Sequence, residues 1–258
     1  MKLVRYLVDG SIGHGELIGD GIREFTDGLF GSRTPSGVER ALADVELRSP
    51  VVPSKIIGTG LNYAAHALEH HIDLPEVPLF FFKPPSALIL SGEPIQIPDE
   101  RHHVNEEAEL VVVIGSRARH VSVDNALEHI LGYTCGNDVS DRDVQGIDRN
   151  WTARAKGFDT FAPILPYVET EFDFRDASIE ARINGNVVQS GSTRDLIFDV
   201  ATLVSFASGC FTLEPGDLLF TGTPSGVSPV HPGDTVSVTI EGIGSLVNPV
   251  EQLLVTAR

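Results

Sequence analysis

Two glutamates and one aspartate are the residues of this sequence that point most directly to chemistry. Glu107 and Glu109 stand two positions apart in EEAELVVVIG, whose valines predict a strand, so both side chains should project from one face. Asp138 ends the strand-like stretch GYTCGND, where a short acidic side chain can point into a cleft. Three carboxylates form a hard-oxygen ligand set that suits Mg²⁺, Mn²⁺ or Ca²⁺ rather than Zn²⁺. The alternative is an exposed acidic strand edge on an acidic protein.

A histidine and a glutamate form a second candidate pair. His66 and Glu69, in GLNYAAHALEHH, are three positions apart and would meet on one side of a helix. A neutral imidazole oriented by a carboxylate can take a proton near pH 7. The same spacing also fits an ordinary intrahelical pair on a surface helix. We interpret the neighbouring His70 and His71 as bystanders.

The composition excludes several classes of partner. With 36 acidic and 19 basic residues the chain has a formal net charge of -17, which repels nucleic acid and anionic lipid. The longest apolar run is LVVVI, far below the ~20 residues of a membrane span, and the N-terminal stretch lacks the apolar core of a signal peptide. Two cysteines outside any zinc-binding spacing fit a reducing cytoplasm. A small anionic substrate stays compatible, because a bound divalent cation reverses the local field.

Strand-length apolar runs between turn signals predict a β-rich α+β fold. Asn184-Gly185 predicts a tight hairpin, because both central positions of that turn favour positive φ. Pro-Gly pairs at 215–216 and 232–233 predict type II turns. Helices are predicted over residues 38–45, 62–70, 123–131 and 194–208.

Five segments occur in the order found in the fumarylacetoacetate hydrolase family, which the sequence resembles from about residue 54 to 250: EEAELVVVIG, GYTCGNDVSDRDVQ, KGFDTFAPILP, INGNVVQSGST and LLFTGTPSGV. Five linked motifs make a chance agreement improbable. The resemblance implies a rolled, mixed β-sheet catalytic domain of β-barrel-like form over residues 51–258, after a small variable N-terminal region at 1–50. It also implies a homodimer.

The resemblance further implies roles for individual residues. The metal, Mg²⁺ or Mn²⁺, would be held by Glu107, Glu109 and Asp138. His66 would deprotonate water with Glu69 as its orienting partner. Lys156 would lie near the metal, where its ammonium would stabilise an enolate or oxyanion. Without the resemblance, a lysine in this stretch would be interpreted as a solvated surface residue.

Substrate contacts are expected from three further residues. Arg142 and Gln145, in SDRDVQ, are candidates for binding a substrate carboxylate or carbonyl, since the guanidinium fork matches a carboxylate. Thr223, in GTPSGV, could donate to the same ligand or belong to an ordinary turn. Glu106 and Asp141 depart from the family pattern and add negative charge, which predicts a neutral or cationic distal group on the substrate.

The implied activity is metal-dependent cleavage of a carbon–carbon bond in an acylpyruvate-like 2-oxo acid, within the catabolism of aromatic compounds. The pair of His66 and Glu69 favours hydrolysis. An oxaloacetate-type decarboxylase and a 2-hydroxyhepta-2,4-diene-1,7-dioate-type isomerase make the same electronic demand, an enolate beside a carboxylate, and remain alternatives. A non-enzymatic metal-binding scaffold is the alternative from another class.

Overall fold

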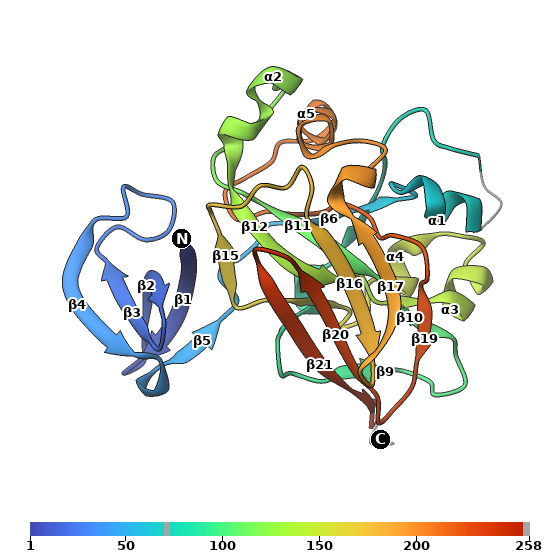
Figure 1. The fold of residues 1–258 in the computed structure, drawn as a ribbon, viewed down its shortest axis with the longest axis horizontal. Coiled ribbons are helices and arrows are strands. Elements are labelled where there is room, and N and C mark those ends of the chain that lie inside the picture. The colour runs from blue at the N-terminus through green and yellow to red at the C-terminus, as the bar shows by residue number, and fades with distance from the viewer. Residues whose placement is uncertain (70–72, 255–258) are drawn as a thin grey trace.

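The computed structural model describes residues 1–69 and 73–254. Within these residues the strands form sheets of 13, five and three strands, with short helices at their edges (Figure 1). Parallel pairs join β18 to β6, β14 to β8 and β21 to β9, among mostly antiparallel neighbours. The predicted β-rich, mixed-sheet fold is confirmed.

The largest sheet runs through the whole molecule and is open, because its order starts at β4 and ends at β7. Its path in space is β4 (Pro35–Ala41), β3 (Gly21–Phe25), β2 (Ser11–Ile18), β1 (Lys2–Val8), β15 (Tyr167–Glu169), β12 (Ile130–Asn137), β11 (Ala108–Ile114), β18 (Leu218–Phe220), β6 (Ile56–Gly60) and β7 (Leu79–Lys83). Three strands branch from this path: β5 (Glu46–Arg48), β8 (Leu88–Leu90) and β14 (Ala162–Ile164).

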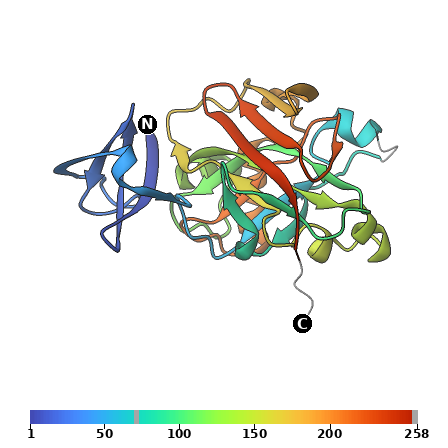
Figure 2. The ribbon, with the colours of Figure 1, turned by 90° about the horizontal axis from the view of Figure 1, so that it is seen from below.

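Two smaller sheets complete the fold: the five-stranded sheet packs on β11 and β12, and the three-stranded sheet shares a core cluster with the five-stranded one. The five-stranded sheet has the order β17 (Asn186–Ser192), β16 (Ser178–Ile183), β20 (Thr235–Ile240), β21 (Gly244–Gln252) and β9 (Ile95–Ile97). The three-stranded sheet has the order β13 (Ser140–Asp141), β10 (Val104–Glu106) and β19 (Ser228–Val230). Figure 2 shows the long strand β21 crossing the face of the main body.

Strand β11 is the centre of the core, because all of its residues are buried. Leu110 and Val112 face the five-stranded sheet and α5, a helix at residues 200–210. Val111 and Val113 pack on the opposite face, with Leu218 and Phe220 of β18. A strand buried on both faces has a continuous apolar sequence rather than an alternating one. The run LVVVI therefore marks a central strand, and the residues just before it enter the molecule's interior.

The helices are short. They are α1 (Ala64–Glu69), α2 (Val123–Ala126), α3 (Arg142–Ile147), α4 (Thr152–Ala155) and α5 (Val200–Cys210), with 3-10 turns at Leu42–Asp44, Pro85–Ala87, Leu127–His129 and Thr193–Asp195. In both views α1, α3 and α4 lie on the side away from the N-terminal strands (Figures 1 and 2). No helix within the described residues is long and apolar enough to cross a bilayer.

Several predicted helices differ from those observed. The helix predicted over 38–45 is wrong: the segment is β4 and a 3-10 turn, and pairing with β3 satisfies its backbone while leaving most of its side chains outside the core. The helix predicted over 123–131 ends at Ala126, because a 3-10 turn leads into β12. The helix predicted over 194–208 begins later, at Val200, where the Asp199 side chain accepts a hydrogen bond from the Thr202 amide at 2.8 Å.

The predicted turns are present. Asn184 and Gly185 have φ values of 52° and 82° and join β16 to β17. Gly216 and Gly233 have φ values of 90° and 97°, as a type II turn requires at its third residue. The helix predicted over 62–70 is α1 as far as Glu69, and the histidines at 70 and 71 lie outside the described residues.

The N-terminal strands form a small unit of their own, seen at the left of Figure 1. Val4, Tyr6 and Ile22 form its buried core. The unit continues the large sheet because β1 pairs with β15, with Leu3 opposite Val168. The division of the chain near residue 50 stays a prediction.

Candidate functional site

Three buried carboxylates meet where β11 and β12 run side by side. Glu109 lies in β11, Glu107 in the connection before it, and Asp138 directly after β12. The antiparallel register sets Ala108 opposite Asn137, and the Asp138 amide donates to the Glu107 carbonyl at 2.9 Å. One carboxylate oxygen from each acid lies within 4.8 Å of the others, and exposure is 5%, 1% and 1% for Glu107, Glu109 and Asp138. The alternative interpretation, an exposed acidic strand edge, is therefore wrong.

Three cations surround these acids. The Lys156 ammonium donates to Glu107 Oε2 at 3.0 Å and also to Asp138 Oδ2. The Lys83 ammonium donates to Asp138 Oδ1 at 2.5 Å, and the Arg142 guanidinium donates to Glu107 Oε1. Lys83 and Lys156 are both buried, so the charges compensate one another inside the protein rather than through solvent.

Opposing effects set the pKa values of the two glutamates. Burial raises the pKa of Glu109 well above its usual range, and the negative charges of Asp138 and Glu107 add to this effect. Burial also acts to raise the pKa of Glu107, but the charges of Lys156 and Arg142 outweigh it and hold this pKa below the usual range. Glu109 is thus the acid whose charge the protein compensates least, and a bound cation would compensate it.

The donor set fits a hard divalent ion. Glu107, Glu109 and Asp138 offer oxygen ligands only, and these oxygens already lie close together in a buried position. The acids are also held by the backbone. The Gly222 amide donates to Glu109 Oε2 at 2.7 Å, and Asn137 Oδ1 accepts from the Glu107 amide at 2.9 Å. These three carboxylates would hold Mg²⁺ or Mn²⁺.

Gly222 has a geometric reason to be glycine. Its φ is 99°, and a Cβ at this position would lie 2.8 Å from the Asn62 Cβ. The chain can therefore turn here and direct its amide at Glu109 only without a side chain.

Strand β17 supplies a residue, Gln189, that links strand β11 to Thr223. Gln189 is completely buried, accepts from the Ala108 amide at 2.8 Å and donates to Thr223 Oγ1 at 2.8 Å. Accepting this hydrogen bond leaves the Thr223 hydroxyl proton able to be donated to a ligand. Thr223 lines a cavity of 130 Å³ together with Glu107 and Lys156.

The cavity also contains the histidine of the predicted acid–base pair. His66, on α1, is 7% exposed and lines the same 130 Å³ cavity. Its Nδ1 lies 3.6 Å from Glu69 Oε2, a distance that suits a charge interaction but exceeds a hydrogen bond. The Glu69 carboxylate also accepts from the Gly226 amide at 3.2 Å, so it ties α1 to the loop after β18.

The first turn of α3 brings the last two predicted residues to this place. Asp141 begins the helix, with its side chain accepting from the Val144 amide at 2.9 Å. Arg142 Nη1 then donates to Gln145 Oε1 at 3.0 Å, and both side chains line the cavity. Eight of the nine residues expected at the site lie at the carboxylates or along this cavity: Glu107, Glu109, Asp138, His66, Lys156, Arg142, Gln145 and Thr223. Glu69 does not line the cavity and reaches it only through His66.

Comparisons with known proteins identify the family. The family model described as fumarylacetoacetate (FAA) hydrolase C-terminal matches residues 55–251. This chain belongs to the fumarylacetoacetate hydrolase family. A second model, described as Rv2993c-like, N-terminal, matches residues 1–50 of this family member.

Relatives in the fumarylacetoacetate hydrolase family carry several activity names. Protein Rv2993c of Mycobacterium tuberculosis is 46% identical over 88% of this chain and 87% of its own length. The mitochondrial oxaloacetate decarboxylase of Dictyostelium discoideum is 40% identical over 73% of this chain and 89% of its own. The structure of 5-carboxymethyl-2-hydroxymuconate delta-isomerase from Mycobacterium smegmatis matches with 42% identity and a TM-score of 0.90, covering 98% of this chain and 100% of that one.

A more distant relative was solved with a metal. The maleylpyruvate hydrolase from Sphingobium sp. SYK-6, in complex with manganese (II) ion and pyruvate, has 29% identity and a TM-score of 0.79, covering 98% of this chain and 100% of that one. Three of these relatives are thus named as enzymes: a hydrolase, a decarboxylase and an isomerase.

The two acidic departures from the family pattern do not line the cavity. Glu106 is completely buried, and burial raises its pKa to about 8, so it is mainly uncharged at neutral pH. Asp141 is also buried, and its carboxylate caps the start of α3 and contacts His102 Nδ1 at 2.8 Å. The charge that these residues were expected to add to the substrate's distal end is absent from the cavity lining.

Three residues of the site were not predicted from the sequence: Lys83, Ser140 and Gln189. Lys83 follows the apolar stretch LFFF, and a lysine that continues a predicted strand is a signal for a buried ion pair. Ser140 Oγ accepts a hydrogen bond from the Lys156 ammonium at 2.7 Å. A serine between two aspartates carries no sequence signal for such a contact. Gln189 belongs to the motif INGNVVQSGST, but only the folded hairpin shows that it reaches the site.

Proposed function

We propose that this protein is a Mg²⁺- or Mn²⁺-dependent hydrolase that cleaves a carbon–carbon bond in an acylpyruvate-like 2-oxo acid. The observation that carries the proposal is one cavity lined by a metal-ligating acid, a histidine and a lysine, namely Glu107, His66 and Lys156. Such a site can bind a carboxylate, take a proton from water and stabilise an enolate in the same place.

The charges of the site favour an anionic substrate. Glu107, Glu109 and Asp138 are matched in number by three cations, Lys83, Lys156 and Arg142. When bound, the divalent ion adds positive charge and polarises the 2-oxo group as a Lewis acid. Because the ion raises the net charge of a site that is already balanced, a 2-oxo acid and its enolate become favourable ligands there.

The residues of the chain divide the work. Arg142 has N–H groups beyond those bound to Glu107 and Gln145, and with Thr223 it can orient the substrate carboxylate. His66 takes a proton from water, which adds to the distal carbonyl carbon. The bond from that carbon to the methylene carbon then breaks, and its electron pair becomes the enolate of pyruvate. The Lys156 ammonium stabilises the enolate oxygen, and the acyl group leaves as a carboxylic acid.

Decarboxylation or isomerisation is the second candidate. Glu69 is 3.6 Å from His66, and its carboxylate accepts a hydrogen bond from the Gly226 amide. The contact between the two residues proposed to activate water is therefore longer than the hydrogen bonds that join Lys156 to the buried acids. An enolate formed by loss of carbon dioxide, or by proton transfer, needs Lys156 and the metal ligands but no attack by water. The decarboxylase and isomerase names of the relatives support this candidate.

The test is the ultraviolet absorbance of acetylpyruvate mixed with the purified protein, first with Mg²⁺ or Mn²⁺ and then with chelator. Metal-dependent loss of absorbance, with equimolar acetate and pyruvate as products, is the expected result. Loss without acetate, or turnover of oxaloacetate alone, would favour the second candidate. No turnover of acetylpyruvate, oxaloacetate or a hydroxydienoate, combined with tight metal binding, would leave the non-enzymatic scaffold.

We propose a homodimer in the cytoplasm, with residues 1–50 as a region distinct from the catalytic part at 51–258. Light scattering of the purified protein tests the dimer directly.

A further inference from the structure

A second, larger cavity adjoins the one at the carboxylates. It has a volume of 680 Å³, and His66, Phe81 and Arg142 line both cavities. A compact 2-oxo acid can occupy the inner cavity near the metal ligands. The remainder of a longer substrate would then enter the outer cavity.

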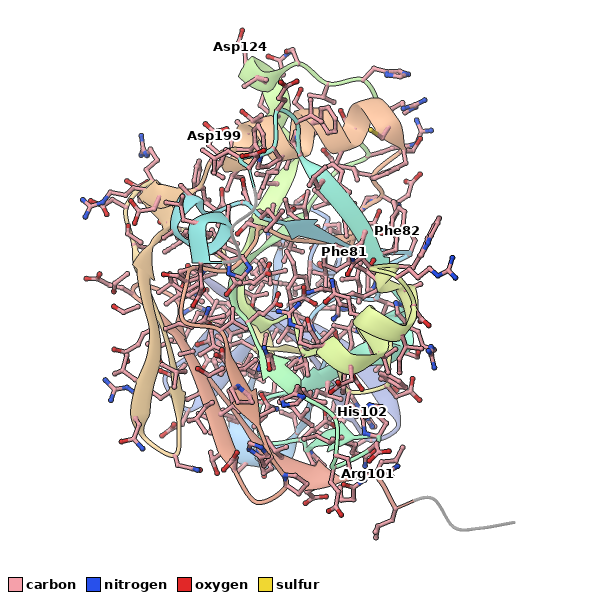
Figure 3. All side chains as sticks on the ribbon, turned by 90° about the vertical axis from the view of Figure 1, so that its right-hand side faces the viewer. Phe81, Phe82, Arg101, His102, Asp124 and Asp199 are labelled. Atoms are coloured by element: carbon pink, nitrogen blue, oxygen red, sulfur yellow. The ribbon has the colours of Figure 1, made fainter. Side chains whose placement is uncertain are left out.

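The lining of the outer cavity is largely apolar where β6 ends and β7 begins. Leu61, Leu79, Phe80 and Phe81 all contribute to it. Figure 3 views the molecule from the side on which β7 carries Phe81. The Lys156 ammonium lies 4.7 Å from the centre of the Phe81 ring, so this ring marks the boundary between the charged site and the apolar cavity.

The polar residues of the outer cavity are uncharged, apart from His66 and Arg142, which also line the inner cavity. Gln145, Asn150 and Thr152 offer amides and a hydroxyl. Arg142 is the charged group, and its guanidinium is directed inward to Glu107 and Gln145. Within residues 1–69 and 73–254, no lysine and no second arginine lines this cavity.

We propose that the acyl group of the substrate is uncharged and apolar, an alkyl or aryl group that lies against Leu79 and Phe81. This inference rests on the proposed function and narrows its substrate class to acylpyruvates with one carboxylate. Burial of an apolar group against these side chains is favourable in proportion to the area removed from water. A second carboxylate would lose water there without gaining a cation, because Arg142, the charged residue of this lining, is assigned to the first carboxylate.

Two exposed apolar residues are chain neighbours of the cavity lining. Trp151 is 78% exposed and follows Asn150 and precedes Thr152 in the sequence, and both of these line the cavity. It is the single tryptophan of the sequence, so we expect its fluorescence to change when a ligand occupies the cavity. Ile147, at the end of α3, is also exposed and follows Gly146 of the lining.

The first test compares acylpyruvates that differ only at the far end. With Mg²⁺ present, the kcat/KM of heptanoylpyruvate should exceed that of acetylpyruvate by about ten-fold or more. It should exceed by the same factor the kcat/KM of an equally long acylpyruvate that ends in a carboxylate. A lower KM should account for the difference. A carboxylate-ended substrate that equals or exceeds heptanoylpyruvate overturns the inference, while turnover of acetylpyruvate still upholds the proposed function.

A binding measurement separates the two proposals if no acylpyruvate is cleaved. Trp151 fluorescence is titrated with 2-oxooctanoate and with the 2-oxo dicarboxylate of equal length, each with Mg²⁺. About ten-fold tighter binding of 2-oxooctanoate supports the apolar cavity independently of hydrolysis. Equal binding, or tighter binding of the dicarboxylate, overturns it.

A matched pair of variants locates the effect. Leu79 and Leu127 are 45% and 44% exposed, but only Leu79 lines the cavity. Leu79→Arg should shift the ratio of heptanoyl- to carboxylate-ended substrate by about ten-fold toward the carboxylate, whereas Leu127→Arg should leave this ratio unchanged. The milder Leu79→Gln should lower the ratio if the arginine variant is poorly folded. Equal ratios in all variants would overturn the inference. A fall in oligomer mass as the sole effect of Leu79→Arg would overturn it too and would assign this surface to a second copy of the chain.

Discussion

The Lys83 ammonium binds Oδ1 of Asp138 at 2.5 Å, and the Lys83 side chain has no exposed surface. Lys156 binds the other oxygen, Oδ2, so both oxygens of this proposed metal ligand are held by ammonium groups. Burial lowers the pKa of Lys83, and the charge of Asp138 opposes this shift. The orientation of Asp138 is thus set by the protein before an ion or substrate binds.

Replacing Lys83 by methionine should destabilise the metal-free protein by about 3–5 kcal/mol, because it leaves a buried carboxylate with one cation fewer. Mg²⁺ should restore part of this loss, since an ion at the carboxylates replaces the missing charge. Urea unfolding with and without Mg²⁺ measures both quantities. The double variant Lys83→Met with Asp138→Asn should be more stable than Lys83→Met alone. A double variant that is less stable would contradict the ion pair.

The two glutamates should respond differently to neutralisation. Glu109→Gln removes a buried charge that repels its neighbours and can still accept from the Gly222 amide, so the metal-free fold should survive with little loss of stability. Glu107→Gln should cost about 3–5 kcal/mol, because Lys156 and Arg142 lose their shared partner. Loss of a ligand should weaken Mn²⁺ binding by at least about 100-fold in Glu109→Gln, measured by calorimetry. Full activity of Glu109→Gln would contradict its role as a ligand.

The grouping of the three carboxylates was easier to predict from the sequence than the helix boundaries were. Glu107, Glu109 and Asp138 are marked by charge beside a continuous apolar run, a pattern that survives without coordinates. Residues 38–45 carry no comparable signal, because a half-exposed edge strand and a short helix have similar composition, and pairing with β3 decides between them. The start of α5 depended on one capping side chain, Asp199.

Long-range contacts explain the residues that the sequence did not reveal. Gln189 reaches Ala108 across 81 positions, and Lys83 reaches Asp138 across 55. Neither separation leaves a periodic pattern, because the contact depends on how three sheets pack. The same is true of Asp141, whose charge was expected near the substrate and is instead used to begin α3.

His66→Ala should remove hydrolysis and spare metal binding. The imidazole lines the cavity at the carboxylates but is not among the grouped metal ligands. Loss of a general base should lower kcat for acetylpyruvate by about 10²- to 10⁴-fold. The exposed His231 provides the control, and His231→Ala should retain full turnover. Unchanged hydrolysis in His66→Ala would remove the histidine from the mechanism, and retained oxaloacetate decarboxylation alone would favour the second candidate.

The two thiols should differ sharply in reactivity. Burial raises the pKa of Cys135 to about 12, whereas Cys210 is exposed at the end of α5. At pH 8 only about one in ten thousand Cys135 side chains would be thiolate, the reactive form. A thiol reagent at pH 8 should therefore titrate one thiol per native chain and two after denaturation. Cys210→Ser should abolish the fast reaction, and two fast thiols in the native protein would contradict the burial of Cys135.

The contact between His102 and Asp141 should make stability depend on pH. The hydrogen bond to Asp141 raises the pKa of His102 despite the opposing effect of burial. A raised pKa in the folded state means that the stabilisation is complete below the unfolded pKa of about 6.5 and is lost as the pH rises through the folded value. His102 lies on the loop at the lower edge of the view in Figure 3, next to Arg101.

The matching variant is His102→Gln, which keeps a hydrogen-bonding side chain and loses the charge. It should be less stable than the natural protein by about 0.2–1 kcal/mol at pH 6 and by less at pH 9, measured by urea unfolding. His103→Gln tests the neighbouring exposed pair with Asp143 and should change stability little at either pH, because water screens that contact. A His102→Gln variant with equal stability deficits at pH 6 and pH 9 would show that the contact acts through packing rather than through charge.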